Sequence, residues 1–407
     1  MRILRQFYQA LPTLFFVFCA LVMVGIIYSP YLLSIGLLGM LGSSLLAYFP
    51  AIKSYFKYPS FWTISLLFVI VLMGFWSIED PQYWVERLRI KLPFLLLPIA
   101  FYLQPKLTEK QFLGLLYFWI VLLFLTSIGI GGHYLLHRNE IITMMAQGHP
   151  IPTPRNHIRF STALAMGVLS GWYLIKSKFY LKKPIEKKLL IVMTLFLFIF
   201  IHFLSVRTGI LALYVALGLV ILSQTFLYKK YLLGMGMLLL LSMLPVLAYR
   251  FVPSFQTKIN YMIWDLNSYQ KGEGGNAADA GRITSLKVGY DIFSSHPIMG
   301  IGAGNLRKVT KAKFRKDYPQ YVEALTPHNQ FLYILAGSGV VGGLLFAIAF
   351  LFPLFYKNNY RHPLFLGFYG ILFVTFILEH SIENAIGVAF SAFFLLLLIN
   401  YLNGRLI

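Results

Sequence analysis

The stretch "PHNQFLYILAGSGVVGG", residues 327–343, begins with a proline, a histidine and two amides and then continues as an apolar run. Of the 407 residues in the chain, 58% are hydrophobic and 12% are charged, which is more apolar surface than a water-soluble fold of this size needs. A helix crosses a hydrocarbon core of about 30 Å with roughly 17 to 25 apolar residues. Residues 329–356 form such a run, so this stretch predicts a membrane-entering helix with the ionisable side chain of His328 at its mouth.

Further apolar windows extend this pattern along the chain, and together they predict an all-α polytopic membrane protein with about 12 transmembrane helices. The fourth window is short and carries Pro93 and Pro98, which is typical of a broken or re-entrant segment. The windows are 12–28, 31–49, 60–77, 92–104, 111–131, 160–175, 189–205, 208–227, 231–249, 329–356, 364–380 and 384–402.

Two connecting segments are longer than the others. Residues 132–158 are rich in His, Pro and amides, and residues 250–327 form a loop of ordinary soluble-protein composition. Loops of that length are usually functional or disordered, and near-helical spacing of apolar residues in "RITSLKVGYDIFSS" favours a partly helical periplasmic lid. The predicted organisation is therefore 1–249 with nine helices and a periplasmic segment near 132–158, 250–327 as the lid, and 328–407 with helices 10–12.

The net charge of +21 would suggest a nucleic-acid partner in a soluble protein. A cytoplasmic N-terminus explains most of it, because the inside loops then hold seventeen basic residues and only two acidic ones, Glu109 and Glu186. An excess of Lys and Arg in cytoplasmic loops is the usual determinant of membrane orientation. We therefore expect both termini in the cytoplasm, contact with membrane lipids and no nucleic-acid partner.

Arg207 lies in "HFLSVRTGILALYVALG", between two apolar runs joined by almost no loop, at the predicted outer face. Charges at a membrane mouth are expensive, so Arg207 is a functional candidate; the alternative is a snorkelling arginine that ends a helix. The small neighbours Ser205, Thr208 and Gly209 favour function, because they would let a bulky ligand approach the guanidinium.

Arg282 follows the glycine-rich stretch "KGEGGNAADAG" and begins the helical pattern of the long loop. A guanidinium near a helix N-terminus can bind phosphate with two hydrogen bonds, although a solvated loop arginine is the commoner situation. Further along, "HPIMGIGAGNL" has alternating glycines without a βαβ context, which indicates a tight turn rather than a nucleotide site. His133 and His137 have no acidic or thiol partners, so the sequence predicts no metal site.

His328 and Asn329 lie near the start of the stretch at residues 327–343, just before its apolar run. A neutral imidazole just outside the hydrocarbon could accept a proton from a substrate, whereas the alternative is a histidine that caps the helix. Other basic residues add positive charge at the predicted outer face and, with Asn329, are candidate substrate-binding residues: Arg87, Arg89, Lys91 and Arg159.

Four motifs occur in order over roughly residues 155 to 350: "SVRTG", "GR" at the start of a helix, "HPIMGIGAGN" and "PHNQFLYILAGSGVVGG". In their order, spacing and topology they resemble the O-antigen ligase and polymerase superfamily of bacterial membrane glycosyltransferases. Each motif is short, but the four together are specific. The chain has Arg-Thr-Gly where many members have Arg-Gly, which leaves the arginine in place.

The resemblance implies a glycan donor linked to undecaprenyl diphosphate and a hydroxyl acceptor on lipid A-core, joined at the periplasmic face of the bacterial inner membrane. It implies neither a nucleotide sugar nor a metal or other cofactor. The arginine of the family near the outer face maps to Arg207, its loop arginine to Arg282 and its catalytic histidine to His328. In this scheme the arginines hold the diphosphate, and the histidine acts as general base in an inverting transfer.

Three functions stay open from the sequence, and the ligase is favoured. A ligase transfers the polysaccharide to lipid A-core, whereas a polymerase of the same superfamily extends the glycan on its lipid carrier. A membrane transporter of lipid-linked glycan belongs to a different class and would need charges buried at the midplane of several spans. Glu379, His380 and Glu383 instead cluster near a predicted outer turn.

Overall fold

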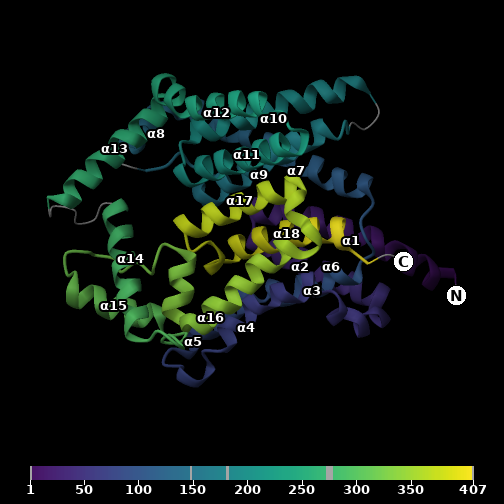
Figure 1. Cartoon of the computed structure of the whole chain (residues 1–407), viewed down its shortest axis with the longest axis horizontal. Helices are drawn as coiled ribbons and strands as arrows, with labels where there is room; N and C mark the ends of the chain where they lie inside the picture. The colour runs from purple at the N-terminus through teal and green to yellow at the C-terminus, as the bar shows by residue number, and fades with distance from the viewer. Residues whose placement is uncertain (1, 147–148, 180–182, 272–277, 406–407) are drawn as a thin grey trace.

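The computed structural model describes residues 2–146, 149–179, 183–271 and 278–405. The glycine-rich segment 272–277 lies outside these residues. Throughout the described ranges the secondary structure is helical, with one isolated bridge between Pro105 and Arg405, so the predicted all-α fold is confirmed. Figure 1 shows most of the helices running roughly side by side, with both termini at one end and α13, α14 and α15 at the other.

The helices before the long loop are α1 (Arg2–Tyr28), α2 (Pro30–Tyr48), α3 (Pro59–Trp62), α4 (Leu66–Leu72), α5 (Pro81–Lys91), α6 (Pro93–Leu103), α7 (Glu109–Leu136), α8 (Arg138–Ala146), α9 (His157–Lys176), α10 (Pro184–Leu204), α11 (Arg207–Tyr228) and α12 (Tyr231–Phe251). After them come α13 (Pro253–Gln270), α14 (Ala278–Ser295), α15 (Leu306–Asp317), α16 (Gln330–Phe355), α17 (Pro363–Leu378) and α18 (Ala385–Asn403). Short 3-10 turns join some of them: η1 (Phe49–Lys57), η2 (Thr63–Ser65), η3 (Phe75–Ser77), η4 (Tyr356–Arg361) and η5 (Ser381–Glu383).

Nine helices in the described part of the chain are long and apolar enough to cross a membrane. Three of the twelve predicted windows form shorter elements: 60–77 gives a helical stretch that ends at Leu72, 92–104 gives the eleven-residue α6 with Pro98 inside it, and 364–380 gives α17. The first ends just before Gly74, against which Gly302 and Ala303 pack, and α17 ends where Glu379 becomes extended. These two helices are shorter than their apolar windows because the chain leaves the helix before each window ends.

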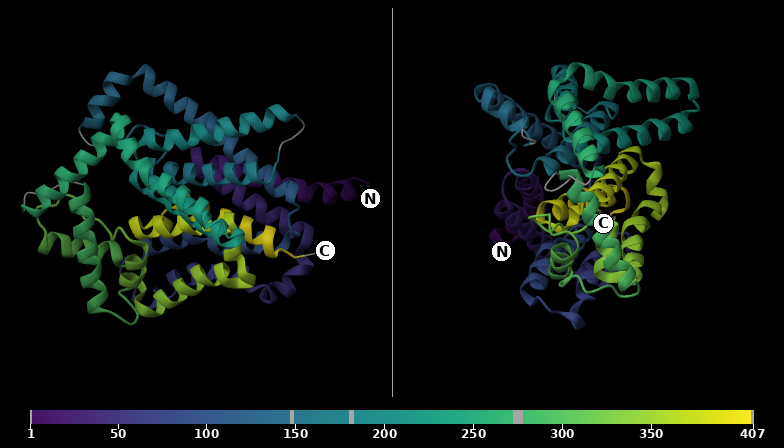
Figure 2. Two further views of the ribbon diagram at one scale, coloured as in Figure 1. Left: turned by 45° about the horizontal axis from the view of Figure 1, so that its top comes forward. Right: turned by 90° about the vertical axis from the view of Figure 1, so that its left-hand side faces the viewer.

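The helices of the bundle pack around α9 and α18, which are largely enclosed by their neighbours, whereas α12 exposes most of its apolar side chains. Small residues allow the close approaches, as is usual between helices in membranes. Figure 2 shows the hairpin of α1 and α2 on a different side of the bundle from α12. The spanning helices therefore form a packed bundle whose outer surface is apolar.

The predicted tight turn at residues 296–304 docks onto a break in α16. Gly339 has φ 61°, which interrupts the helix, and a Cβ there would lie 2.2 Å from the carbonyl oxygen of Ile298. The freed backbone is paired across the junction: Gly302 N–H donates to Gly337 O (2.9 Å), and Val340 N–H donates to Pro297 O (2.8 Å). Buried backbone groups need such partners, so the turn fixes the long loop against α16.

Candidate active site

Arg207 is the first residue of α11, directly after a tight connection from α10. Ser205 ends α10 in the left-handed conformation (φ 55°), and its hydroxyl donates to the carbonyl oxygen of His202 (2.9 Å). The guanidinium of Arg207 forms a two-pronged pair with Asp279 of α14, at 2.9 and 2.7 Å. The side chain of Arg207 stays 38% exposed, so part of this cation faces open space.

The small residues beside Arg207 pack helices together, and two of them also border a cavity. A Cβ on Gly209 would lie 2.4 Å from the Cβ of Ser161, so the glycine allows α11 to approach α9. Ser205 shares a hydrogen bond with Ser254 (2.9 Å), and Thr208 is buried. Ser205 and Thr208 also line a cavity together with Arg207, so two of these small residues leave room beside it.

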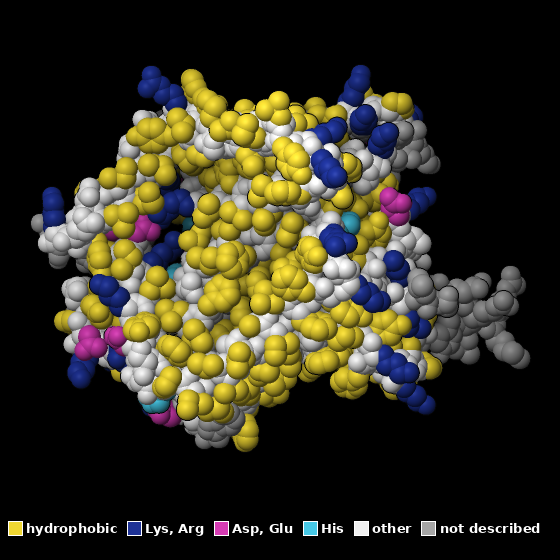
Figure 3. Space-filling view, in the orientation of Figure 1, with side chains coloured by type: hydrophobic (Ala, Val, Ile, Leu, Met, Phe, Trp, Pro, Cys, Tyr) yellow, Lys and Arg dark blue, Asp and Glu magenta, His cyan; other side chains and the backbone are white. Residues whose placement is uncertain are grey.

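Arg282 lies one helical turn after Asp279 on α14, so the two arginines approach each other through this helix. Its guanidinium donates to a carboxylate oxygen of Glu379 at 2.6 Å. Arg207 and Arg282 line the same cavity of about 280 Å³, together with Lys258 and His157. Burial lowers the pKa of the Lys258 ammonium, and the Arg207 cation lowers it further. Figure 3 shows Lys and Arg side chains around a hollow near the end formed by α13 and α14.

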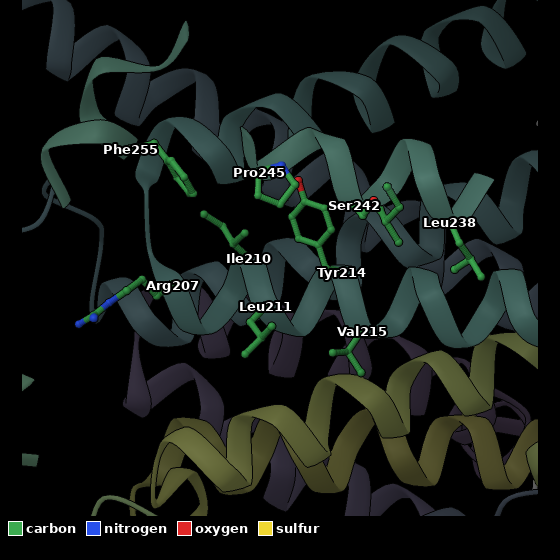
Figure 4. A pocket seen from close by; sticks show the side chains of 10 residues that line it. Arg207, Ile210, Leu211, Tyr214, Val215, Leu238, Ser242, Pro245 and Phe255 are labelled. Carbon is green, nitrogen blue, oxygen red and sulfur yellow. The ribbon is translucent and has the colours of Figure 1, made fainter. Parts of the chain in front are cut away.

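An apolar groove of about 450 Å³ extends away from Arg207 between α11 and α12. In Figure 4, Arg207 lies at one end of a row of side chains that leads along α11 through Leu211 and Val215, with Pro245 of α12 opposite. Arg207 lines this apolar groove as well as the polar cavity. Both spaces therefore border Arg207, whose guanidinium points away from the groove in Figure 4, an arrangement that suits a ligand with an anionic head and a long apolar tail.

His328 precedes α16 and is held from two sides. Its backbone N–H donates to the hydroxyl of Ser285 on α14 (3.2 Å), and its Nδ1 lies 3.0 Å from the carbonyl oxygen of Thr326. A carbonyl can only accept, so Nδ1 carries the proton and the Nε2 lone pair of the neutral ring stays available. Burial lowers the pKa of the His328 imidazole; Glu379 raises it and Arg282 lowers it.

Glu379 and His380 complete the surroundings of His328. The rings of His328 and His380 are edge to face with centroids 4.8 Å apart, and His380 stacks on Tyr333. Burial lowers the pKa of His380 to about 3, and its buried Nδ1 has no hydrogen-bond partner among the described residues. Ligand-type atoms of His328, Glu379 and His380 lie within 4.8 Å of one another. The predicted outer turn thus supplies an acid and an imidazole to the site.

Arg159 reaches this turn from α9. Its Nε donates to the side-chain oxygen of Asn384 at 3.4 Å, a long hydrogen bond next to the start of α18. Sequence reasoning placed Arg159 at the outer face, and the fold brings it to the same turn that carries Glu379 and His380. Arg159 is therefore a further cation close to Arg282 and His328.

Arg87 and Lys91 occupy a buried cluster behind the site. Lys91 is 1% exposed and donates to Glu383 at 2.7 Å, and Gln330 of α16 donates to the same carboxylate oxygen (2.8 Å). Arg87 donates to the backbone carbonyl of Glu383 at 2.6 Å. Burial raises the pKa of the Glu383 carboxyl, but the Lys91 cation and these hydrogen bonds outweigh that effect, so the pKa is lowered. The cluster ties α5 and α16 to the turn before α18, and the space beside it is only about 10 Å³.

The last two candidate substrate-binding residues lie apart from this cluster. Asn329 caps α16: its side-chain oxygen accepts from Leu332 N–H (2.9 Å), and its amide donates to the carbonyl oxygen of Ile377 (2.9 Å). The helix cap is therefore Asn329 rather than His328. Arg89 is exposed and lines a different cavity, next to α2 and α6.

Glu379 and His380 are the functional candidates that sequence reasoning did not assign to the site. They follow an apolar window about 50 residues after His328, and the only signal was a group of ionisable residues at a predicted outer turn. A charged residue within or at the edge of the membrane is a functional candidate, but the sequence does not predict which residue it contacts.

Comparison with known proteins agrees with the motifs. Residues 191–347 match a family model described as O-antigen ligase, whereas comparison with curated proteins gives no match. The matched range contains Arg207, Arg282 and His328; Arg159 and Glu379 lie outside it. The match at residues 191–347 is consistent with the O-antigen ligase and polymerase superfamily and confirms the resemblance found in the sequence.

Proposed function

We propose that this protein is an O-antigen ligase. It transfers a polysaccharide from undecaprenyl diphosphate to a hydroxyl group of lipid A-core at the periplasmic face of the inner membrane. The observation that carries the proposal is the position of Arg207, which lines both the apolar groove and the polar cavity with Arg282. A polyprenyl tail fits the groove chemically, and a diphosphate fits the cavity.

The diphosphate would bind by charge and by geometry. Three cations, Arg207, Arg282 and Lys258, line the cavity. A guanidinium has five N–H donors in a planar fork that matches phosphate oxygens, and Asp279 takes two of those of Arg207. The remaining donors are available to a ligand, and an incoming diphosphate could also replace the carboxylate.

The reaction follows from these roles. The acceptor hydroxyl oxygen attacks the anomeric carbon, a new glycosidic C–O bond forms, and the bond from this carbon to the diphosphate oxygen breaks. Nε2 of His328 takes the hydroxyl proton, because its Nδ1 is already committed as a donor to Thr326. Undecaprenyl diphosphate leaves with the bond electrons, and Arg207 and Arg282 stabilise the charge that develops on it. A single displacement inverts the anomeric centre and proceeds without a metal.

The orientation in the membrane is part of the proposal. Figure 3 shows Lys and Arg side chains at the end of the molecule that carries the termini, with a broad apolar band across the middle. Cytoplasmic loops are enriched in basic residues, so this end would face the cytoplasm. The candidate active site lies toward the other end, with α13 and α14, and would face the periplasm.

The test is genetic, and it separates the ligase from the two alternatives. Deletion of the gene should leave full-length glycan on undecaprenyl diphosphate and no glycan on lipid A-core. Single repeat units on lipid A-core would instead identify a polymerase. Accumulation of the carrier-linked glycan on the cytoplasmic side would identify a transporter. Complementation with His328→Ala should fail, whereas the exposed His296→Ala variant should restore transfer.

A further inference from the structure

A second apolar cavity of about 400 Å³ lies between α2 and α6, away from the groove of α11 and α12. Its lining includes Leu37 and Leu38 of α2, Leu96 of α6 and Ala385 at the start of α18. The residue before Ala385 is Asn384, which accepts from Arg159. The cavity therefore borders the residue that directly follows the turn with Glu379 and His380.

Among the described residues, Arg89 is the one charged residue that lines this second cavity. On the buried face of α5, Arg87 and Lys91 both bond to Glu383, whereas Arg89 points the other way and is exposed. Within the part of the chain that the structure describes, Arg89 forms no hydrogen bond or ion pair with another side chain. A cation beside an apolar cavity in a membrane protein is costly unless an anion meets it.

We propose that this cavity, with Arg89 at its mouth, binds the lipid part of the acceptor, a glycolipid that carries phosphate on its head. The proposal rests on the proposed function, because it assigns the second substrate of the same site. Arg89 would hold the phosphate, and the apolar walls would hold an acyl chain. The acceptor would then reach His328 from the side of α5 and α18, while the donor reaches it from the side of α11.

The chain permits a direct binding test because its one cysteine, Cys19, is fully buried. Ser34 lines the second cavity and Ser242 lines the groove of α11 and α12, so Ser34→Cys and Ser242→Cys place matched reporters in the two spaces. The rate of maleimide labelling is measured in detergent with lipid A, with undecaprenyl phosphate, and with diacylglycerol, which lacks phosphate. These probes separate an acceptor lipid from a donor lipid and from any apolar lipid.

We expect lipid A to slow labelling of Ser34→Cys and to leave labelling of Ser242→Cys unchanged, with the reverse for undecaprenyl phosphate. Adding Arg89→Ala should weaken the protection of Ser34→Cys by lipid A about tenfold, the loss of one charge-assisted contact, and Arg89→Lys should restore part of it. Arg138→Ala, an exposed arginine outside both spaces, should have no effect. Equal protection by diacylglycerol, stronger protection by undecaprenyl phosphate, or no effect of Arg89→Ala would each overturn the proposal.

Failure of this inference is distinct from failure of the proposed function. If lipid A does not protect Ser34→Cys from labelling but the protein still ligates in cells, the second cavity is not the acceptor site. The proposed ligase function would still stand. Conversely, a His328→Ala protein that still transfers glycan would reject the base, while the labelling results could stand.

Discussion

Two ion pairs of this protein have the same distance between their charged atoms but differ in how far their side chains are buried. Arg207 and Asp279 meet at 2.7 Å with side chains 38% and 12% exposed, whereas Lys91 and Glu383 meet at 2.7 Å with 1% and 5% exposed. The first pair borders a cavity and a groove, and the second borders almost no space. Only the first cation can therefore exchange its carboxylate for a substrate anion.

The difference in burial indicates different roles: the exposed pair is available for substrate binding, and the buried pair positions other residues. Lys91, Gln330 and Glu383 join three segments that are far apart in sequence, so they set the place of the turn that carries Glu379 and His380. A buried pair loses much of its Coulomb gain to desolvation, but removal of one partner leaves an uncompensated charge. Arg207, at the edge of the cavity, loses little when Asp279 leaves, because water or phosphate can replace it.

The largest expected effect is at His328, which belongs to neither pair. His328→Ala should lower the single-turnover rate by about 10²- to 10⁴-fold, the range for loss of a general base, with donor affinity nearly unchanged. The rate is measured with purified protein, carrier-linked glycan and lipid A-core, and His296→Ala serves as the matched control. A folded His328→Ala protein with a near wild-type rate would remove the base assignment.

Replacing the cation of each pair should change the free energy of unfolding by different amounts. Lys91→Met should lower the free energy of unfolding by about 3–5 kcal/mol, because it leaves the Glu383 carboxylate buried without its cation. Arg207→Met should lower it by only about 0–1 kcal/mol, because its pair is partly exposed. Unfolding in mixed micelles with increasing SDS measures both variants. Similar losses of unfolding free energy in the two variants would show that burial does not decide how much each ion pair contributes to stability.

The pH dependence of turnover should follow the imidazole of His328. Burial lowers its pKa below the ordinary value of about 6.5, so the ring is neutral at pH 7 and the rate should fall only on the acid side of pH 6.5. Glu379 raises this pKa, so Glu379→Gln should move the acid limb to lower pH, and Arg282→Gln should move it to higher pH. Movement of the Glu379→Gln limb to higher pH would contradict the assignment of the limb to His328.

The smallest expected effect is that of a chelator. His328, Glu379 and His380 offer metal-ligand atoms within 4.8 Å, but Arg282 already occupies an oxygen of Glu379. In the proposed reaction these groups move a proton and hold charge, so turnover in EDTA should equal turnover without it. A loss that Mg²⁺, Mn²⁺ or Zn²⁺ restores would refute the metal-free scheme.

The sequence predicted the class of fold because apolar runs of spanning length leave few other structures possible. The four motifs also indicated Arg207, Arg282 and His328; the fold brings Arg207 and Arg282 to one cavity, and the roles of all three stay predictions. The windows 60–77 and 364–380 extended beyond their helices, because hydropathy does not register where Gly74 meets the 296–304 turn or where Glu379 leaves the helix. The residue type identifies a charge at the edge of the membrane, but it does not predict which residue pairs with that charge.

The remaining differences have the same cause. Lys91 looked like Arg89 in "VERLRIK", yet their spacing on α5 buries one and exposes the other. Its partner Glu383 lies almost 300 residues away, and only the folded chain brings them together. Asn329 caps α16, a role that sequence reasoning did not assign to it, and its part in substrate binding stays a prediction.

The most direct test of the account is the affinity of purified protein for undecaprenyl diphosphate in two variants of the exposed pair. Arg207→Lys keeps the charge and loses the planar fork, so binding should weaken about tenfold. Asp279→Asn removes the competing carboxylate, so binding should stay as tight as in the wild type or become tighter. Weaker binding in both variants, with the Asp279→Asn protein also destabilised, would show that this pair is a structural bridge like Lys91 and Glu383, and would contradict the account.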